Sequence, residues 1–175
     1  TEQAYDSGAP AAKAPETSSC KLNNVDLVIA AEGFFESTPE EYRKILAIVK
    51  KLGTQAMSGK SVGTKISFYH YDRLPERQGI HLDEHIDTGS FGDAIDNLAE
   101  KHHSANEHDL VWAMDEAVTT AFDRYNDEVK DLLLVITDGA DKRGGKEAID
   151  GLKAAELAAL HNKVTVMVLG VGPKV

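Results

Sequence analysis

Cysteine and long apolar runs are both scarce in this 175-residue chain. The single cysteine, Cys20, cannot form a disulfide within the chain, so a disulfide-stapled scaffold is excluded and the redox compartment stays undetermined. The longest mostly apolar runs, Val25–Ala31 and Leu132–Ile136, are far shorter than the ~20 residues that a bilayer-spanning helix needs. We therefore expect no membrane insertion.

Positive charge is also under-represented. The chain has 19 basic and 29 acidic side chains, which gives a formal net charge of -10 at pH 7. A field of this sign repels phosphate backbones and anionic lipid surfaces. Nucleic acid is therefore excluded as a partner, and the expected partner is a protein.

No catalytic constellation is present in the sequence. Nucleophilic catalysis needs a nucleophile beside an orienting base, but Cys20 lies in the amino-terminal region and no Gly-x-Ser-x-Gly elbow occurs. The many carboxylates are scattered, which is normal for a chain of this charge and defines no acid/base pair. We expect that the protein is not an enzyme.

The composition is that of an ordinary globular domain, with 42% hydrophobic and 27% charged residues. Residues 1–23 are separate from that domain, because most of them are Ala, Pro, Ser, Glu and Thr without periodicity, which predicts a flexible tail or linker. Residues 24–175 are long enough for one folded domain. Because the chain begins at Thr1 without a leader, we interpret it as a piece of a longer protein.

Apolar patterns alternate between strand and helix along residues 24–175. The predicted strands are Val25–Ala31, Lys65–Tyr71, Gly79–Leu82, Asp131–Thr137 and Val164–Leu169. The first predicted helix begins at Pro39, and Gly53 is a point where it ends or bends. The other predicted helices cover Phe91–Lys101, Asp109–Tyr125 and Lys146–His161. Strands separated by crossover helices predict an α/β fold with a doubly wound, mostly parallel central sheet, flanked by helices on both faces.

Three segments, in this order, resemble signatures of the von Willebrand factor type A family. The first runs Asp26-Leu27-Val28-Ile29-Ala30-Ala31-Glu32-Gly33, the second Leu133-Leu134-Val135-Ile136-Thr137-Asp138-Gly139, and the third Val166-Met167-Val168-Leu169-Gly170-Val171-Gly172. The segment from Ala113 to Ala117 is similar to the helix that follows the family's middle metal loop. The resemblance implies the doubly wound fold and a function in adhesion or recognition.

The resemblance also implies a metal-ion-dependent adhesion site, but the chain departs from that motif. The first strand of metal-binding members ends in Asp-x-Ser-x-Ser, whereas this chain has Glu32, Phe34 and Glu36 at those positions. The middle loop supplies no threonine at the aligned position, and Asp138 alone is retained. A hard cation needs several oxygen ligands, so we expect a degenerate site without a cofactor.

Two alternatives for these acids stay open. Glu32, Glu36 and Asp138 would be the ligands if a divalent cation such as Mg²⁺ or Ca²⁺ binds through carboxylates alone. The interpretation that we favour treats Glu32 and Asp138 as solvated loop acids, with Phe34 filling the space of a hydrated ion.

The carboxyl-terminal part of the family's fold is missing from the sequence. The resemblance implies a sixth strand and a final helix after Val175, so a sheet face or edge left uncovered would associate with another chain or segment. It also implies that Cys20 pairs with a cysteine beyond the last helix, and a buried or simply unpaired thiol is the alternative.

Loops at the carboxyl ends of the strands are the expected partner-binding surface. The predicted rim consists of Glu32, Phe34, Glu36, Glu107, His108, Asp138 and Asp141. The favoured function is a metal-free adhesion or recognition module of a secreted or cell-surface protein. The alternatives are an intracellular scaffold that assembles complexes through sheet edges and helices, and a divergent enzyme with a two-carboxylate metal site on Glu32 and Asp138.

Overall fold

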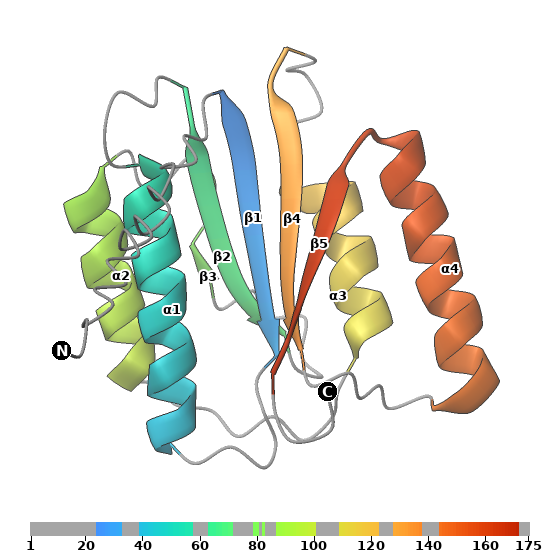
Figure 1. The fold of residues 1–175 in the computed structure, drawn as a ribbon, viewed down its shortest axis with the longest axis horizontal. Helices are drawn as coiled ribbons and strands as arrows, with labels where there is room; N and C mark the ends of the chain where they lie inside the picture. The colour runs from blue at the N-terminus through green and yellow to red at the C-terminus, as the bar shows by residue number, and fades with distance from the viewer. Residues whose placement is uncertain are drawn as a thin grey trace, which may run out of the picture.

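The computed structural model describes residues 24–32, 39–57, 63–71, 79–80, 82, 87–100, 109–122, 128–137 and 144–171. Strands and helices alternate over this part of the chain (Figure 1). The strands are β1 (Val25–Glu32), β2 (Lys65–Tyr71), β3 (Gly79–Ile80), β4 (Lys130–Thr137) and β5 (Thr165–Gly170). The helices are α1 (Pro39–Met57), α2 (Thr88–Glu100), α3 (Leu110–Glu116), the π-helical segment η1 (Ala117–Ala121) and α4 (Gly145–His161).

The five strands form one sheet in the order β3-β2-β1-β4-β5. β1 is central and pairs in parallel with β2 on one side and with β4 on the other, and β5 continues the sheet in parallel from β4. Only the two-residue β3 runs antiparallel to its neighbour. The predicted doubly wound, mostly parallel sheet is confirmed.

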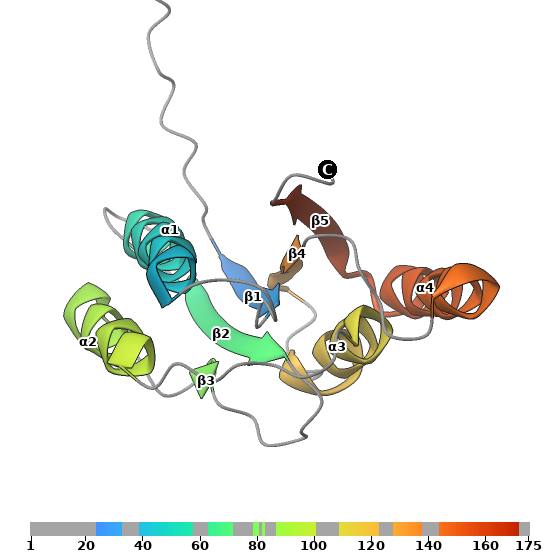
Figure 2. The same cartoon turned by 90° about the horizontal axis from the view of Figure 1, so that it is seen from below.

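Helices lie on both faces of the sheet. α1 and α2 are on one side, and α3 and α4 are on the other (Figure 2). The helices on the first side cover the face of β1 that carries Val25, Leu27, Ile29 and Ala31. The helices on the second side cover the face that carries Val28 and Ala30. Every residue of β1 is therefore buried. Burial on both faces is why this strand reads as a nearly continuous apolar run. None of the described helices is both long and apolar enough to cross a bilayer.

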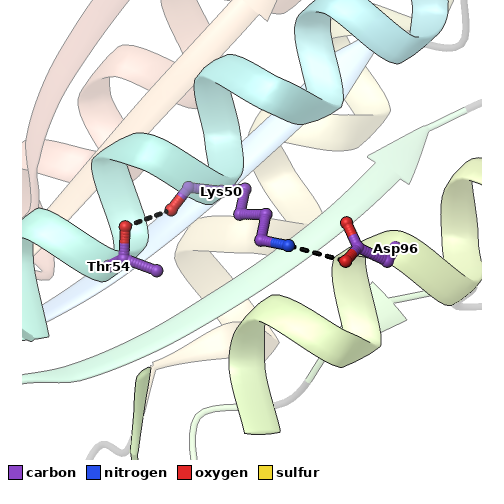
Figure 3. A network of polar contacts seen from close by, with 3 residues as sticks. All are labelled: Lys50, Thr54 and Asp96. Carbon is purple, nitrogen blue, oxygen red and sulfur yellow. Dashed lines mark hydrogen bonds and ion pairs between the residues drawn. The ribbon is translucent and has the colours of Figure 1, made fainter. Parts of the chain in front are cut away.

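Gly53 does not end the first helix, because α1 continues to Met57. Its missing side chain instead allows α1 to approach α2, since a Cβ at Gly53 would lie 2.2 Å from Cε1 of Phe91. Lys50 and Asp96 form an ion pair across the same two helices, with 2.6 Å between Nζ and Oδ2 (Figure 3). One turn along α1, the Thr54 hydroxyl donates to the Lys50 carbonyl.

The helix predicted over Asp109–Tyr125 is shorter and less regular than expected. α3 ends at Glu116 and continues as the π-helical η1 only to Ala121. Here the Thr119 and Thr120 hydroxyls donate to the carbonyls four residues earlier, at 2.7 Å each. Such bonds compete with the backbone ladder, and they accompany the departure from α-helical geometry.

An apolar run such as Val164–Leu169 predicts a strand that is almost fully buried on both faces. For Val166 and Val168 of β5 this prediction is wrong, because Val168 is 64% exposed and Val166 is only partly buried. The physical reason is position, because β5 is the last strand of the sheet and no described strand lies beyond it. Met167 and Leu169, on the opposite face, are also exposed.

Candidate functional site

Four parallel strands end at the same edge of the sheet. The last residues of β1 and β2, Glu32 and Tyr71, are register partners, as are Thr137 and Gly170 at the ends of β4 and β5. Sheets of this class bind ligands beyond the carboxyl ends of their strands. We therefore treat this carboxyl edge as the candidate functional site.

A buried hydrogen bond joins the two central strands at the carboxyl edge. The Thr137 hydroxyl donates to Oε2 of Glu32 over 2.8 Å, and the two residues are 3% and 1% exposed. Hydrogen bonds to charged acceptors contribute more to stability than neutral ones, and this bond connects residues that are 105 positions apart. The bond therefore fixes the ends of β1 and β4 relative to each other.

Tyr42 and His70 close the neighbouring part of the edge on the α1 face. Their rings meet edge to face with centroids 6.4 Å apart, and Tyr42 is 4% exposed. Burial raises the pKa of Tyr42 to about 12, because the phenolate would lose its hydration. The ring pair thus anchors the start of α1, the helix that follows the loop after Glu32.

α3 is anchored at its start, shortly after Glu107 and His108 in the sequence. Oδ1 of Asp109 accepts a hydrogen bond from the Trp112 amide at 3.0 Å, which caps the helix. The Tyr69 hydroxyl donates to the Ala113 carbonyl at 2.7 Å and ties the helix to β2. The sheet therefore holds the start of α3 in place.

Of the seven predicted rim residues, the structure describes Glu32. The other six, Phe34, Glu36, Glu107, His108, Asp138 and Asp141, lie outside the described residues. The interpretation of Glu32 as a solvated loop acid is wrong, because its side chain is buried. The reason is that β1 extends one residue beyond Ala31 and takes the carboxylate into the sheet.

The described residues do not by themselves fit a metal ion. At the ends of β1 and β4 they provide the Glu32 carboxylate and the Thr137 hydroxyl, and these two groups are hydrogen-bonded to each other. Mg²⁺ requires near-octahedral oxygen coordination and Ca²⁺ takes 6–8 oxygen ligands. Within the described part of the chain, no group of three or more His, Cys, Asp or Glu side chains is placed to hold a metal.

Sequence reasoning missed Thr137 as the partner of Glu32. The available signal was their matching position, because each residue ends an apolar strand and the two strands are parallel neighbours. Only the register shows that the two side chains meet, with Ala31 opposite Ile136 one step earlier. Pairing of this kind cannot be read from a single strand.

The von Willebrand factor type A domain model matches residues 27–175. No curated protein sequence matches the chain significantly. Among solved structures, proximal thread matrix protein 1 from the mussel byssus is similar, with a TM-score of 0.71 and 14% identity over 87% of this chain and 39% of that chain. That protein has also been solved with zinc in its MIDAS motif.

Two further structures share the fold. The manganese-loaded TRAP protein of Plasmodium vivax has a TM-score of 0.59 and 19% identity, over 86% of this chain and 58% of that chain. The pilus adhesin SpaC of Lactobacillus rhamnosus GG has a TM-score of 0.54 and 14% identity, over 69% of this chain and 15% of that chain. This chain spans less than two thirds of each of these longer chains, and at these identities the likeness concerns the fold alone.

Proposed function

Because the chain belongs to the von Willebrand factor type A domain family, we propose that it is a non-catalytic adhesion or recognition module that binds a protein partner without a metal ion. The fold supports this proposal by bringing four strand ends to one edge. The structures that share the fold include an adhesin and a thread matrix protein, which supports a secreted or cell-surface location.

The hydrogen bond between Thr137 and Glu32 is the observation that carries the metal-free proposal. Glu32 stands where the family resemblance implies an aspartate ligand, yet its Oε2 accepts the Thr137 hydroxyl within the sheet. A cation bound to this carboxylate would have to share it with that bond and enter a position that is 1% exposed. In our proposal, the side chain stabilises the strand ends beneath the binding surface.

The predicted rim is the proposed contact surface. Phe34 and Glu36 follow β1, Glu107 and His108 precede α3, and Asp138 and Asp141 follow β4. Four of these residues are acidic, so the partner surface that fits them best is basic. Charged rim residues mainly accelerate encounter between partners, whereas the centre of an interface provides most of the affinity.

A binding assay with rim variants tests the proposal. The immobilised chain is exposed to a panel of extracellular-matrix and cell-surface proteins, with and without EDTA. For a protein that binds, the double variant Glu107→Lys and Asp141→Lys should lower the association rate constant by about 10-fold or more, with little change in dissociation.

A matched control has the same change in net charge away from the rim. Asp93 on α2 and Asp115 on α3 are exposed acids, and replacing both with Lys should leave association with the partner nearly unchanged. Equal losses in the two double variants, or binding that EDTA abolishes, would contradict the proposed metal-free rim.

An intracellular scaffold is the second candidate, and the exposed surface of β5 favours it. A scaffold of this type would bind through a sheet edge rather than through the loops. Charged substitutions on β5 that abolish partner binding, together with rim variants that do not, would decide for this alternative.

A further inference from the structure

The starts of the parallel strands lie together at the end of the sheet opposite the carboxyl edge. β1, β2, β4 and β5 all begin at the top of Figure 1, and we call this end the amino edge. Three exposed lysines lie there: Lys65 begins β2, Lys130 begins β4, and Lys163 is two residues before β5. Among the described residues, none of these three lysines has an ion-pair partner.

The register of the sheet places the three lysines in one row. Leu132 and Thr165 are register partners, so Lys130 and Lys163, each two residues earlier, stand level at the starts of neighbouring strands. Lys65 is on the other side of β1, at the start of β2. Because neighbouring strands are ~4.8 Å apart, the row from β2 to β5 is roughly 14 Å long. An extended peptide of about four residues has the same length.

The acids of the amino edge leave this row positively charged at the surface. Asp26 is 1% exposed and Asp131 is half-buried, and both residues take part in interactions within the protein. Glu128 remains exposed beside Lys130. The row therefore sets three surface cations against one surface carboxylate, in a chain whose net charge is -10.

Lys163 has a backbone conformation that disfavours any side chain. Its φ is 59°, in the turn that ends α4. Here the Lys163 amide donates to the Leu160 carbonyl at 3.2 Å, and the Val164 amide donates to the Ala159 carbonyl at 2.9 Å. These bonds form a Schellman motif, whose left-handed residue is usually glycine because a Cβ is strained there. A lysine in this position costs stability, which points to a role in binding.

Asn24 fixes the backbone beside these lysines. Its carbonyl accepts a hydrogen bond from the Lys130 amide at 3.2 Å, and its Nδ2 donates to the Glu128 carbonyl at 3.0 Å. The two bonds hold the segment that enters β4 against the start of β1. Lys130 is therefore presented from a backbone that is already ordered, which lowers the entropic cost of binding.

We infer that the amino edge is a second binding surface, which takes a short acidic segment of a protein partner through Lys65, Lys130 and Lys163. The net charge of -10 decides between kinds of anion. A long polyanion such as a sulfated polysaccharide is repelled by the field of the whole chain, whereas a short acidic segment needs complementary charge only where it binds. This surface lies at the other end of the strands from the predicted rim, so the inference does not depend on the rim.

Fluorescence anisotropy with a labelled peptide of eight glutamates tests this inference. At low ionic strength we expect saturable binding, which a chain of this net charge can give only through a local basic site. The double variant Lys130→Glu and Lys163→Glu should raise the Kd by about 10-fold or more. The matched control, Lys44→Glu and Lys51→Glu, alters two exposed lysines on α1 with the same change in net charge, and should raise the Kd by less than about 2-fold.

The variant Lys163→Gly separates binding from stability. Glycine relieves the strain at φ 59°, so Tm should rise by about 2–4 °C. The same variant removes one of the three cations, so the Kd for the peptide should rise by about 3-fold or more. A higher Tm with an unchanged Kd would show that Lys163 does not bind the peptide and would overturn its role.

Three further results would overturn the inference. The first is a wild-type chain that shows no saturable binding, or equal losses in the two double variants. The second is a heparin octasaccharide that binds at these lysines when the peptide does not, which would make the occupant a polysaccharide. The third is self-association of the chain that Lys130→Glu and Lys163→Glu abolish, which would make the occupant an acidic surface of a second copy.

Discussion

Val135 and Val168 are register partners on β4 and β5 and point to the same face of the sheet, yet the first is 0% exposed and the second 64%. The side chains are identical and the strands are adjacent. The difference arises because β4 has a strand on each side, whereas no strand among the described residues lies beyond β5. This pair provides a direct test of how sheet position determines the cost of a substitution.

Val135→Asp should unfold the domain, whereas Val168→Asp should leave it folded. Burying an unpaired carboxylate at Val135 costs several kcal/mol, against a total stability of roughly 5–15 kcal/mol. At Val168 the new carboxylate stays hydrated. Urea denaturation followed by circular dichroism measures both effects, and a Val135→Asp variant with a wild-type transition would show that the assignment of β4 is wrong.

Gly53→Ala should destabilise the domain by about 1–3 kcal/mol, because its new methyl group would overlap the ring of Phe91. Gly92→Ala is the matched control on the facing helix. Its Cβ would meet the flexible end of Lys50, with Cε at 3.1 Å, so it should cost much less. Melting curves of the two variants check the packing of α1 on α2, and equal stabilities would contradict it.

Thr137→Val should lower the stability by about 1–3 kcal/mol, because it removes a donor to the buried Glu32 carboxylate and keeps the side-chain shape. In a domain of this size each kcal/mol corresponds to roughly 2–4 °C in Tm. Thr137→Ser keeps the hydroxyl and should be closer to wild type. Indistinguishable melting of the Val and Ser variants would mean that the hydrogen bond contributes nothing measurable.

Divalent cations should hardly change the stability. A cation at a hundred-fold excess over its Kd adds about 2.7 kcal/mol, which would raise Tm by roughly 5–11 °C. We expect millimolar Mg²⁺ or Mn²⁺ to shift Tm by no more than about 1–2 °C, an effect of ionic strength. EDTA should have no effect. A large shift that Asp138→Ala abolishes would instead establish Glu32, Glu36 and Asp138 as a carboxylate site.

The stability should fall between pH 10 and 12 through Tyr42. Burial raises the pKa of its hydroxyl from the ordinary value of 10.0 to about 12. Folding therefore disfavours the phenolate, so the stabilisation is complete below pH 10 and declines by up to about 1.4 kcal/mol per pH unit above it. Urea denaturation of wild type and Tyr42→Phe at several pH values isolates this group, and parallel pH profiles would contradict the burial effect.

The central strands and the fold class were predictable because burial on both faces leaves a direct mark on the sequence. The run from Val25 to Ala31 and the run that ends at Thr137 could hardly be anything other than buried strands, and the structure places them side by side. The start of α1 at Pro39 was likewise predictable from its local residues.

The sequence does not indicate whether a strand lies at the centre or at the edge of the sheet. Val166 and Val168 belong to a run as apolar as the central ones, so the sequence indicates a covered strand where the structure has an edge. Glu32 looks like a loop acid by residue type, but its burial depends on the register with β4. The π-helical turn at Ala117–Ala121 is accompanied by hydrogen bonds from two threonine hydroxyls, whose choice of acceptor the periodicity does not reveal.

The hydrogen bond between Glu32 and Thr137 spans 105 positions, and so does the start of the same strand pair, Val25 with Lys130. The central ladder of the sheet therefore cannot form until a long intervening segment has been made and its ends brought together, which costs loop entropy before any contact compensates it. Folds dominated by such distant pairings form more slowly than helical bundles of similar size. During synthesis, β1 can pair with β2 early, but its other edge stays unpaired until β4 leaves the ribosome, and an unpaired strand edge exposes the chain to aggregation during this interval.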